Sequence, residues 1–136
     1  MNIKKSIFFI CIAICITILS GMSLLLSNSV DIKDSTGGTV IFNYDGSNIN
    51  EYLSPDDLNF IIKLFDNKIM YRDDPSCGFT KNTSILLDDS EYFCFARDSC
   101  PVIYWANRNK YFKLSNSEYK SLIKMLSEYG VFFPCV

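Results

Sequence analysis

One stretch of the chain places its apolar residues on a single face of a helix, and these residues are Leu58, Ile61, Ile62 and Phe65. Just before this stretch, Ser54 is suited to the N-cap position and Pro55 to the first helical position. Asp57, three residues after the serine, completes a capping box. The pattern therefore predicts a helix that begins after Ser54 and ends near Asn67.

A second stretch repeats these features near the end of the chain, with its apolar face formed by Tyr119, Leu122, Ile123 and Leu126. Ser115 is the expected N-cap, Glu118 its capping-box partner, and Gly130 the left-handed residue that ends the helix. Leu53 to Phe65 aligns with Leu114 to Leu126, 61 positions later. This weak repeat indicates either two strand-helix-strand halves or two similar helix starts that arose independently.

Strand signals fill much of the remaining sequence. Thr39 to Tyr44 alternates between apolar and polar residues and stops at Asp45-Gly46. Further β-branched or aromatic runs are found at residues 69–71, 84–87, 92–96 and 102–106, with shorter ones at 111–113 and 131–133. We therefore expect an α+β domain in which an antiparallel sheet carries two amphipathic helices on one face.

The N-terminal segment is apolar from Ile7 to Leu26 and follows Lys4 and Lys5. This pattern is typical of a signal peptide or of a membrane anchor, because about 20 apolar residues cross a bilayer. Ser27 and Ser29 fit cleavage before Val30. We expect residues 1–29 to be a signal peptide or signal anchor, residues 30–38 a tether, and residues 39–136 an extracytoplasmic domain.

The charge balance excludes nucleic acid as a partner. Only 13 residues are basic and 15 are acidic. Two of the basic residues are Lys4 and Lys5, so the remainder of the chain carries 11 minus 15, or −4. A nucleic-acid-binding surface needs a basic stripe. The N-terminal segment makes the lipid bilayer the one partner that the composition indicates directly.

Four cysteines follow the apolar segment, at Cys77, Cys94, Cys100 and Cys135. In a small exported domain an even number of cysteines predicts disulfides, and four cysteines allow three pairings. We favour Cys94 with Cys100, and Cys77 with Cys135. A zinc site formed by all four thiolates is less compatible with these spacings, which lack paired C-x-x-C motifs.

Histidine is absent, which excludes Ser-His-Asp and Cys-His catalysis and histidine-ligated metal sites. No metal or cofactor motif is found. A carboxylate-dependent hydrolase stays open, since acids cluster around the predicted turns at Asp73, Asp74, Asp88, Asp89, Glu91 and Asp98. Turns also favour aspartate for local hydrogen bonds, so we expect no catalytic residues.

Aromatic residues provide the better functional signal. Tyr104, Trp105, Tyr111 and Phe112 lie close together in the sequence. In a strand, alternation sends Tyr104 and Trp105 to opposite faces, so one of them is expected outside the main core. We take these four residues as candidate partner-binding residues, against the alternative that they are buried under the second helix.

Several motifs together resemble small exported proteins of low-GC Gram-positive bacteria. They are Pro75-Ser76-Cys77-Gly78-Phe79, Asp98-Ser99-Cys100-Pro101, Tyr111-Phe112-Lys113-Leu114-Ser115, and Tyr129-Gly130-Val131-Phe132-Phe133-Pro134-Cys135. The similarity spans roughly residues 40 to 136. It implies no assigned activity, because proteins of this kind have no function that could be carried over.

The sequence thus predicts a non-catalytic binding domain, anchored in the cell membrane or secreted. Its expected partner is an envelope or extracellular protein or a glycan. Two alternatives belong to other classes: an inhibitor or immunity-type factor against a toxin or protease, and a small envelope hydrolase. An inhibitor would present a rigid exposed loop, best placed at Asp73 to Phe79.

Overall fold

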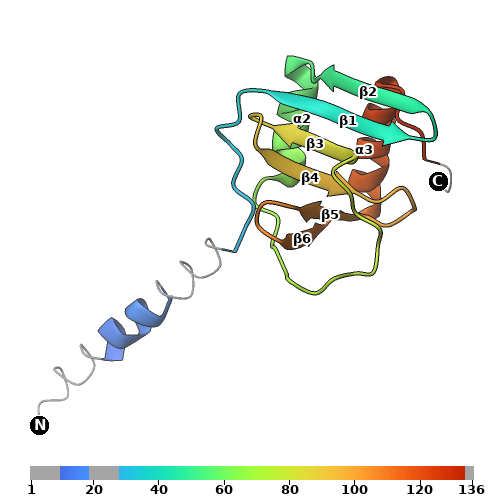
Figure 1. Ribbon diagram of the computed structural model, residues 1–136. Coiled ribbons are helices and arrows are strands. Elements are labelled where there is room, and N and C mark those ends of the chain that lie inside the picture. Colours follow the sequence, from blue (N-terminus) through green and yellow to red (C-terminus); the bar gives the residue numbers. More distant parts are fainter. Residues whose placement is uncertain (1–9, 19–27, 134–136) are drawn as a thin grey trace, which may run out of the picture.

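The computed structural model describes residues 10–18 and 28–133. It is an α+β fold built on a six-stranded antiparallel sheet (Figure 1). The strands are β1 (Gly38–Tyr44), β2 (Ser47–Tyr52), β3 (Thr83–Leu87), β4 (Glu91–Phe95), β5 (Val102–Trp105) and β6 (Lys110–Lys113). Their spatial order is β2-β1-β3-β4-β5-β6, which leaves β2 and β6 at the two edges.

The helices α2 (Pro55–Phe65) and α3 (Asn116–Glu128) begin where the capping residues predict. The Ser54 side chain accepts a hydrogen bond from the Asp57 N–H at the start of α2. At the start of α3, Ser115 and Glu118 form the complete capping box. Gly130, with a φ of 84°, follows the end of α3, as a left-handed terminating residue should. Figure 1 shows both helices behind the strands.

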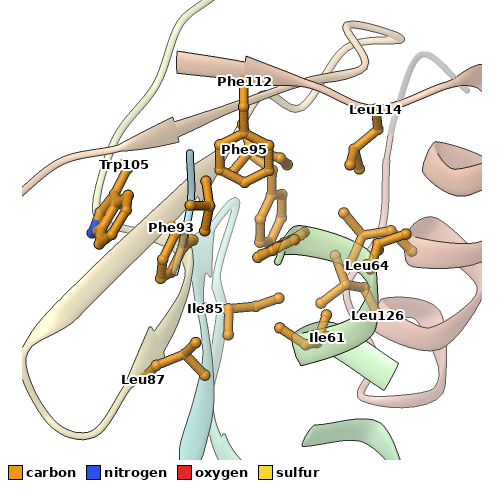
Figure 2. Packing of buried hydrophobic residues seen from close by; sticks show 14 of the residues in the cluster. Ile61, Leu64, Ile85, Leu87, Phe93, Phe95, Trp105, Phe112, Leu114 and Leu126 are labelled. Atoms are coloured by element: carbon orange, nitrogen blue, oxygen red, sulfur yellow. The ribbon is translucent and has the colours of Figure 1, made fainter. Parts of the chain in front are cut away.

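The core lies between these helices and the sheet. Phe93 and Phe95 of β4, Ile85 of β3 and Phe112 of β6 point toward Ile61 of α2 in Figure 2, and all are buried. Leu122 and Leu126 of α3 belong to the same buried cluster. Burial of so many large side chains supplies the main stabilising contribution to the fold.

Strand β2 is missing from the sequence-based prediction. Its residues are mostly polar and exposed, so they give no apolar alternation from which an edge strand could be recognised. The sequence does contain a signal for the turn that leads into β2, namely Asp45-Gly46. Both residues adopt positive φ angles, 50° and 82°, as a two-residue hairpin turn between β1 and β2 requires.

Two of the shorter strand predictions are wrong. Residues 69–71 contribute only isolated bridges, Ser29 with Ile69 and Tyr71 with Tyr111. Residues 131–133 form no strand. Their role is in packing, because Val131 is buried and Phe133 lies against Phe95. Short apolar runs are ambiguous because burial alone, without a ladder, produces the same pattern.

The weak repeat corresponds to a repeated order of elements. The hairpin β1–β2 is followed by α2, and the hairpin β5–β6 is followed by α3. The repeating unit is therefore strand-strand-helix and not the strand-helix-strand unit that the sequence suggested. The two hairpins form the two outer pairs of strands, with β3 and β4 between them.

Residues 30–38, expected to be a tether, lie against the domain. Val30 and Ile32 are buried in the core. The Val30 N–H donates to the Lys68 carbonyl, and the Met70 N–H donates to the Asn28 carbonyl. Among the described residues, the packed part of the chain thus includes residues 28–38 as well as the residues from Thr39 onward.

The predicted signal or anchor segment falls largely outside the described residues, which include only positions 10–18 and 28–29 of it. Residues 10–18 are helical. Among the residues that the structure describes, no helix has the length and apolarity needed to cross a bilayer.

Candidate functional site

The segment between α2 and β3, residues 66–82, runs around the β6 edge of the sheet (Figure 1). Its first attachment is Tyr71. The Tyr71 N–H donates to the Tyr111 carbonyl at 2.8 Å, and the Tyr111 N–H donates to the Tyr71 carbonyl at 2.9 Å. These bonds fix the segment to β6 and pair part of the outer side of this edge strand.

The second attachment is a disulfide between Cys77 and Cys100. It joins the segment to the connection between β4 and β5. The two pairings favoured from the sequence are wrong, because Cys77 and Cys100 bond to each other and Cys94 is a free thiol. Cys135, the fourth cysteine of that prediction, lies outside the described residues. The prediction of a disulfide is confirmed.

The third attachment is a set of rings, Tyr71, Phe79, Tyr104 and Tyr111, called here the ring cluster. Tyr104 and Tyr111 are register partners on β5 and β6 and stack with centroids 4.8 Å apart. Phe79 lies 5.8 Å from Tyr104 and 5.6 Å from Tyr111, and Tyr71 stacks on Tyr111 at 6.0 Å. Alternation places this cluster on the sheet face opposite the helices.

Two hydroxyls of the ring cluster, those of Tyr71 and Tyr111, are neutral at neutral pH. Burial, followed by the charge of Asp73, raises the pKa of Tyr71. Burial and then the charge of Asp74 raise the pKa of Tyr111. Because a phenol ordinarily titrates near pH 10, both hydroxyls stay protonated under physiological conditions. The cluster therefore offers aromatic surface and neutral hydroxyl groups to a contact.

Between these attachments lies an exposed loop, residues 72–78, called here the pinned loop. Arg72, Asp73, Asp74, Ser76 and Gly78 are all exposed. The Asp74 carboxylate accepts a hydrogen bond from the Ser76 N–H, and Ser76 has a φ of 61°. The loop is thus held by a bridge on one side, by a disulfide and a ring contact on the other, and by a turn within it.

Two of the four candidate aromatic residues are core residues. Trp105 is 4% exposed and stacks on Phe93 at 5.0 Å, while Phe112 is 0% exposed and packs on Phe65. These two residues cannot serve as surface anchors. Tyr104, half-buried, and Tyr111, buried, stand on the other face, as alternation requires.

Sequence reasoning did not place Tyr71 or Phe79 in a ring cluster. Phe79 ends the exposed loop predicted at Asp73 to Phe79, but the sequence gives it no contact with Tyr104. Tyr71 closes a short apolar run that was taken for a strand. Neither residue carries a periodic signal that would place it beside Tyr104, because the contact depends on how the segment crosses the sheet.

Cys94 lies on β4, opposite Tyr104 in the register, and is 1% exposed. Burial raises the pKa of its thiol to about 11, although the charge of Lys81 lowers it in part. A protonated, buried thiol is a poor nucleophile. The disulfide also consumes the sulfurs of Cys77 and Cys100, which lie close to the Asp98 carboxylate. In this oxidised form the trio offers no thiolate to a metal.

Three of the six acidic residues predicted near turns, Asp74, Asp88 and Asp98, accept backbone hydrogen bonds. Asp88 accepts hydrogen bonds from the Thr36 and Gly37 N–H groups, and Asp98 accepts one from the Cys100 N–H. Burial tends to raise the pKa of Asp88, but the bonds from Thr36, Ser35 and Gly37 outweigh it and leave the pKa lowered. A carboxyl group that acts as a general acid needs a raised pKa, so the lowered pKa of Asp88 does not suit that role.

A pocket of about 240 Å³ lies beside Trp105, where the segment 31–35 passes the turns of two hairpins. Its lining carries charges of both signs: Asp31, Lys33, Asp34, Asp88, Glu91 and Arg108. Glu91 accepts a hydrogen bond from the Trp105 indole N–H, and the Arg108 guanidinium lies 5.2 Å from the Trp105 ring. These contacts within the wall fix Trp105 at the base of the pocket.

No protein-family model, no curated protein and no solved structure matches this chain.

Proposed function

We propose that this protein is a non-catalytic binding domain that acts outside the cytoplasmic membrane through the pinned loop, residues 72–78, and the adjoining ring cluster. The single observation that carries this proposal is an exposed loop attached on both sides. The Tyr71 bridge holds one side, and the Cys77–Cys100 disulfide with the Phe79 ring contacts holds the other.

Attachment on both sides matters because binding otherwise costs the entropy of ordering a loop. Each side chain or backbone unit that is already fixed removes part of that cost, and affinity gains accordingly. The rings beside the loop add contact area of the kind that is enriched at interfaces, with half-buried Tyr71, Phe79 and Tyr104 at its border.

The loop also indicates the chemistry of its partner. Arg72 is followed by Asp73 and Asp74, so the exposed tip is polar and carries an excess of negative charge. We propose an envelope or extracellular protein with a basic, partly apolar recess as the partner. Complementary charge accelerates association and fixes the orientation of the complex.

The proposal is tested with the full-length protein, immobilised in detergent and exposed to the envelope and extracellular fractions of the cells that produce it. We expect Asp73→Ala with Asp74→Ala to release a partner that the wild-type chain retains. The matched control is Glu51→Ala with Glu128→Ala, two exposed acids far from the loop in sequence. Equal retention by the loop variant and the control variant would overturn the proposal.

The pinned loop also favours a second candidate, an inhibitor of an extracellular protease. Pro75 and Ser76 lie between the two attached sides, where an inhibitory loop presents the peptide bond that the enzyme engages. Incubation with a panel of purified extracellular proteases should reveal slow, stoichiometric loss of one activity. Rapid cleavage of the loop without loss of any activity would exclude this candidate.

We propose further that residues 1–29 act as an uncleaved anchor. Cleavage before Val30 would remove Asn28 and Ser29. The Asn28 side chain donates to the Met70 carbonyl, and Ser29 bridges Ile69, so both residues contribute to the packing of the domain. The intact mass of the protein recovered from cells tests this directly, since cleavage at that position would yield a chain that begins with Val30.

A further inference from the structure

The two edge strands of the sheet differ in whether their outward-facing backbone groups are paired. At the β6 edge, Tyr71 exchanges both backbone hydrogen bonds with Tyr111. At the β2 edge, Asn48, Asn50 and Tyr52 are exposed, and Tyr52 is 84% exposed. An open edge strand presents unpaired N–H and C=O groups to any chain that can pair with it.

The backbone groups that point outward from β2 follow from its pairing with β1. The Leu53 N–H donates to the Gly38 carbonyl, its register partner. The direction of the backbone N–H and C=O groups alternates along an antiparallel strand, so those of Glu51 and Ile49 also point toward β1. Asn48, Asn50 and Tyr52 therefore direct their N–H and C=O groups away from the sheet. Within the described residues, no backbone hydrogen bond to these groups crosses this edge.

Strand β2 also lacks the features that usually prevent an edge strand from pairing with another chain. Its sequence, Ser-Asn-Ile-Asn-Glu-Tyr, contains no lysine and no proline, and it pairs with β1 in an unbroken register. Edge strands that must stay single normally carry such features. The edge is polar and narrow, which suits backbone pairing better than burial of an apolar face.

We infer that β2 pairs with β2 of a second copy of this chain, antiparallel and across a two-fold axis at Asn50. In this register Asn50 faces the partner's Asn50, and Asn48 faces the partner's Tyr52. All three outward-pointing residues then find hydrogen-bonding partners. The two sheets join into one continuous sheet.

Other registers are less favourable. An axis at Ile49 pairs Asn48 with the partner's Asn50 and leaves Tyr52 beyond the strand. An axis at Glu51 sets two carboxylates directly opposite each other, and like charges in that position destabilise a pair. With the axis at Asn50, Glu51 faces the partner's Ile49. The charge distribution of the strand thus selects one register.

Such an interface is short, and we expect a weak, reversible dimer. A six-residue edge buries far less than the roughly 1,600 Å² of a standard stable interface. The association is then concentration-dependent and is best measured over a wide range of protein concentration.

The test measures the dissociation constant of the full-length protein in detergent by sedimentation. Asn50→Lys places like charges across the axis and should raise the dissociation constant by about fivefold or more. Asn50→Asp should do the same. An equimolar mixture of the two variants should restore association, because opposite charges now meet at the axis.

Asn59, exposed on α2, provides the matched control. Asn59→Lys, Asn59→Asp and their mixture should all associate like the wild type. Asn50→Pro removes only an outward-pointing N–H, so it should abolish the dimer while the circular dichroism spectrum is retained. A wild-type chain that stays monomeric at all concentrations, or a mixture of the two Asn50 variants that fails to associate, would overturn the inference.

Discussion

Trp105 joins the core to the surface through three contacts. One face of its ring lies on Phe93, its indole N–H donates to Glu91, and the Arg108 guanidinium is placed near the ring. The first contact belongs to the packing of the sheet against the helices. The other two lie in the wall of the adjacent pocket.

Trp105→Ala should therefore destabilise the fold. The loss of a large buried ring opens a cavity against Phe93 and leaves Glu91 without its donor, which together cost about 3 to 5 kcal/mol. Urea unfolding measures the effect. Tyr52→Ala, at a position that is 84% exposed, is the control and should change the free energy of unfolding very little. Similar values for the two variants would contradict a core position for Trp105.

Cys94 should be protected from alkylation in the native state. Its thiol is buried and its pKa is raised to about 11, so iodoacetamide should label it only after unfolding. An unfolded cysteine titrates about two units lower, near pH 9, so the unfolded state ionises first as the pH rises. Stability should thus fall between pH 9 and 11, and Cys94→Ala should show a weaker fall. Rapid labelling of Cys94 at pH 7.5 in the folded protein would disagree with this position.

At the scale of elements, the two helices are connected by a polar contact as well as by the core. The Tyr129 hydroxyl, just beyond α3, donates to Asp57 in the first turn of α2 and accepts from the Ser54 N–H. Burial, followed by the hydrogen bond to Asp57, raises the pKa of Tyr129. This contact ties the end of one helix to the start of the other.

Ser115→Ala should remove the capping box of α3. The Glu118 N–H then loses its acceptor, and the expected loss is about 1 kcal/mol in the free energy of unfolding. Ser121→Ala, an exposed serine inside the same helix, is the control and should be neutral or slightly stabilising, since alanine is the better helix former. A Ser115→Ala variant as stable as the control would show that the cap contributes nothing.

The elements that could be predicted are those specified by residues close together in the sequence. Ser54 and Ser115 mark helix starts because the backbone N–H groups of a first turn need hydrogen-bond acceptors, and adjacent side chains supply them. Strand β2 gives no such signal because its residues are mostly polar and exposed, although its partner β1 is only a two-residue turn away. The Cys77–Cys100 pairing joins residues 23 positions apart, which no adjacent residues indicate. The sequence favours an exposed loop at Asp73 to Phe79, but nothing within that loop indicates that Phe79 contacts Tyr104.

At the scale of the whole molecule, two carboxylates connect segments distant in sequence. Asp88 holds Thr36 and Gly37 against the β3–β4 turn. Glu118 accepts a hydrogen bond from Lys68 at 2.6 Å and thereby ties the segment that follows α2 to the first turn of α3. The bond from Lys68, followed by that from the Ser115 N–H, lowers the pKa of Glu118.

Acid should therefore weaken the fold through these two groups. Each has a folded-state pKa below its unfolded value, so its stabilising contribution is present above about pH 4 to 5 and is lost as the pH falls through the folded pKa. Lys68→Ala raises the pKa of Glu118 and should shift acid unfolding to higher pH. Asp89→Asn is the control, because Asp89 is the exposed neighbour of Asp88 and its pKa is not invoked in this prediction. An unchanged acid midpoint in Lys68→Ala would contradict the assigned role of the ion pair.

The early attachment of the chain at Asn28 has a mechanical consequence. If residues 1–27 are held in a membrane, a pull on the domain does not load β1 first. It loads the bonds of residues 28–30 to residues 67–70, the buried side chains of Val30 and Ile32, and the Asp88 contacts, all of which lie upstream of the sheet. Their rupture would release residues 28–37, about 35 Å of extended chain, while the six strands remain paired. In such an anchored chain, residues 28–37 would act as a short extensible link that yields before the sheet does.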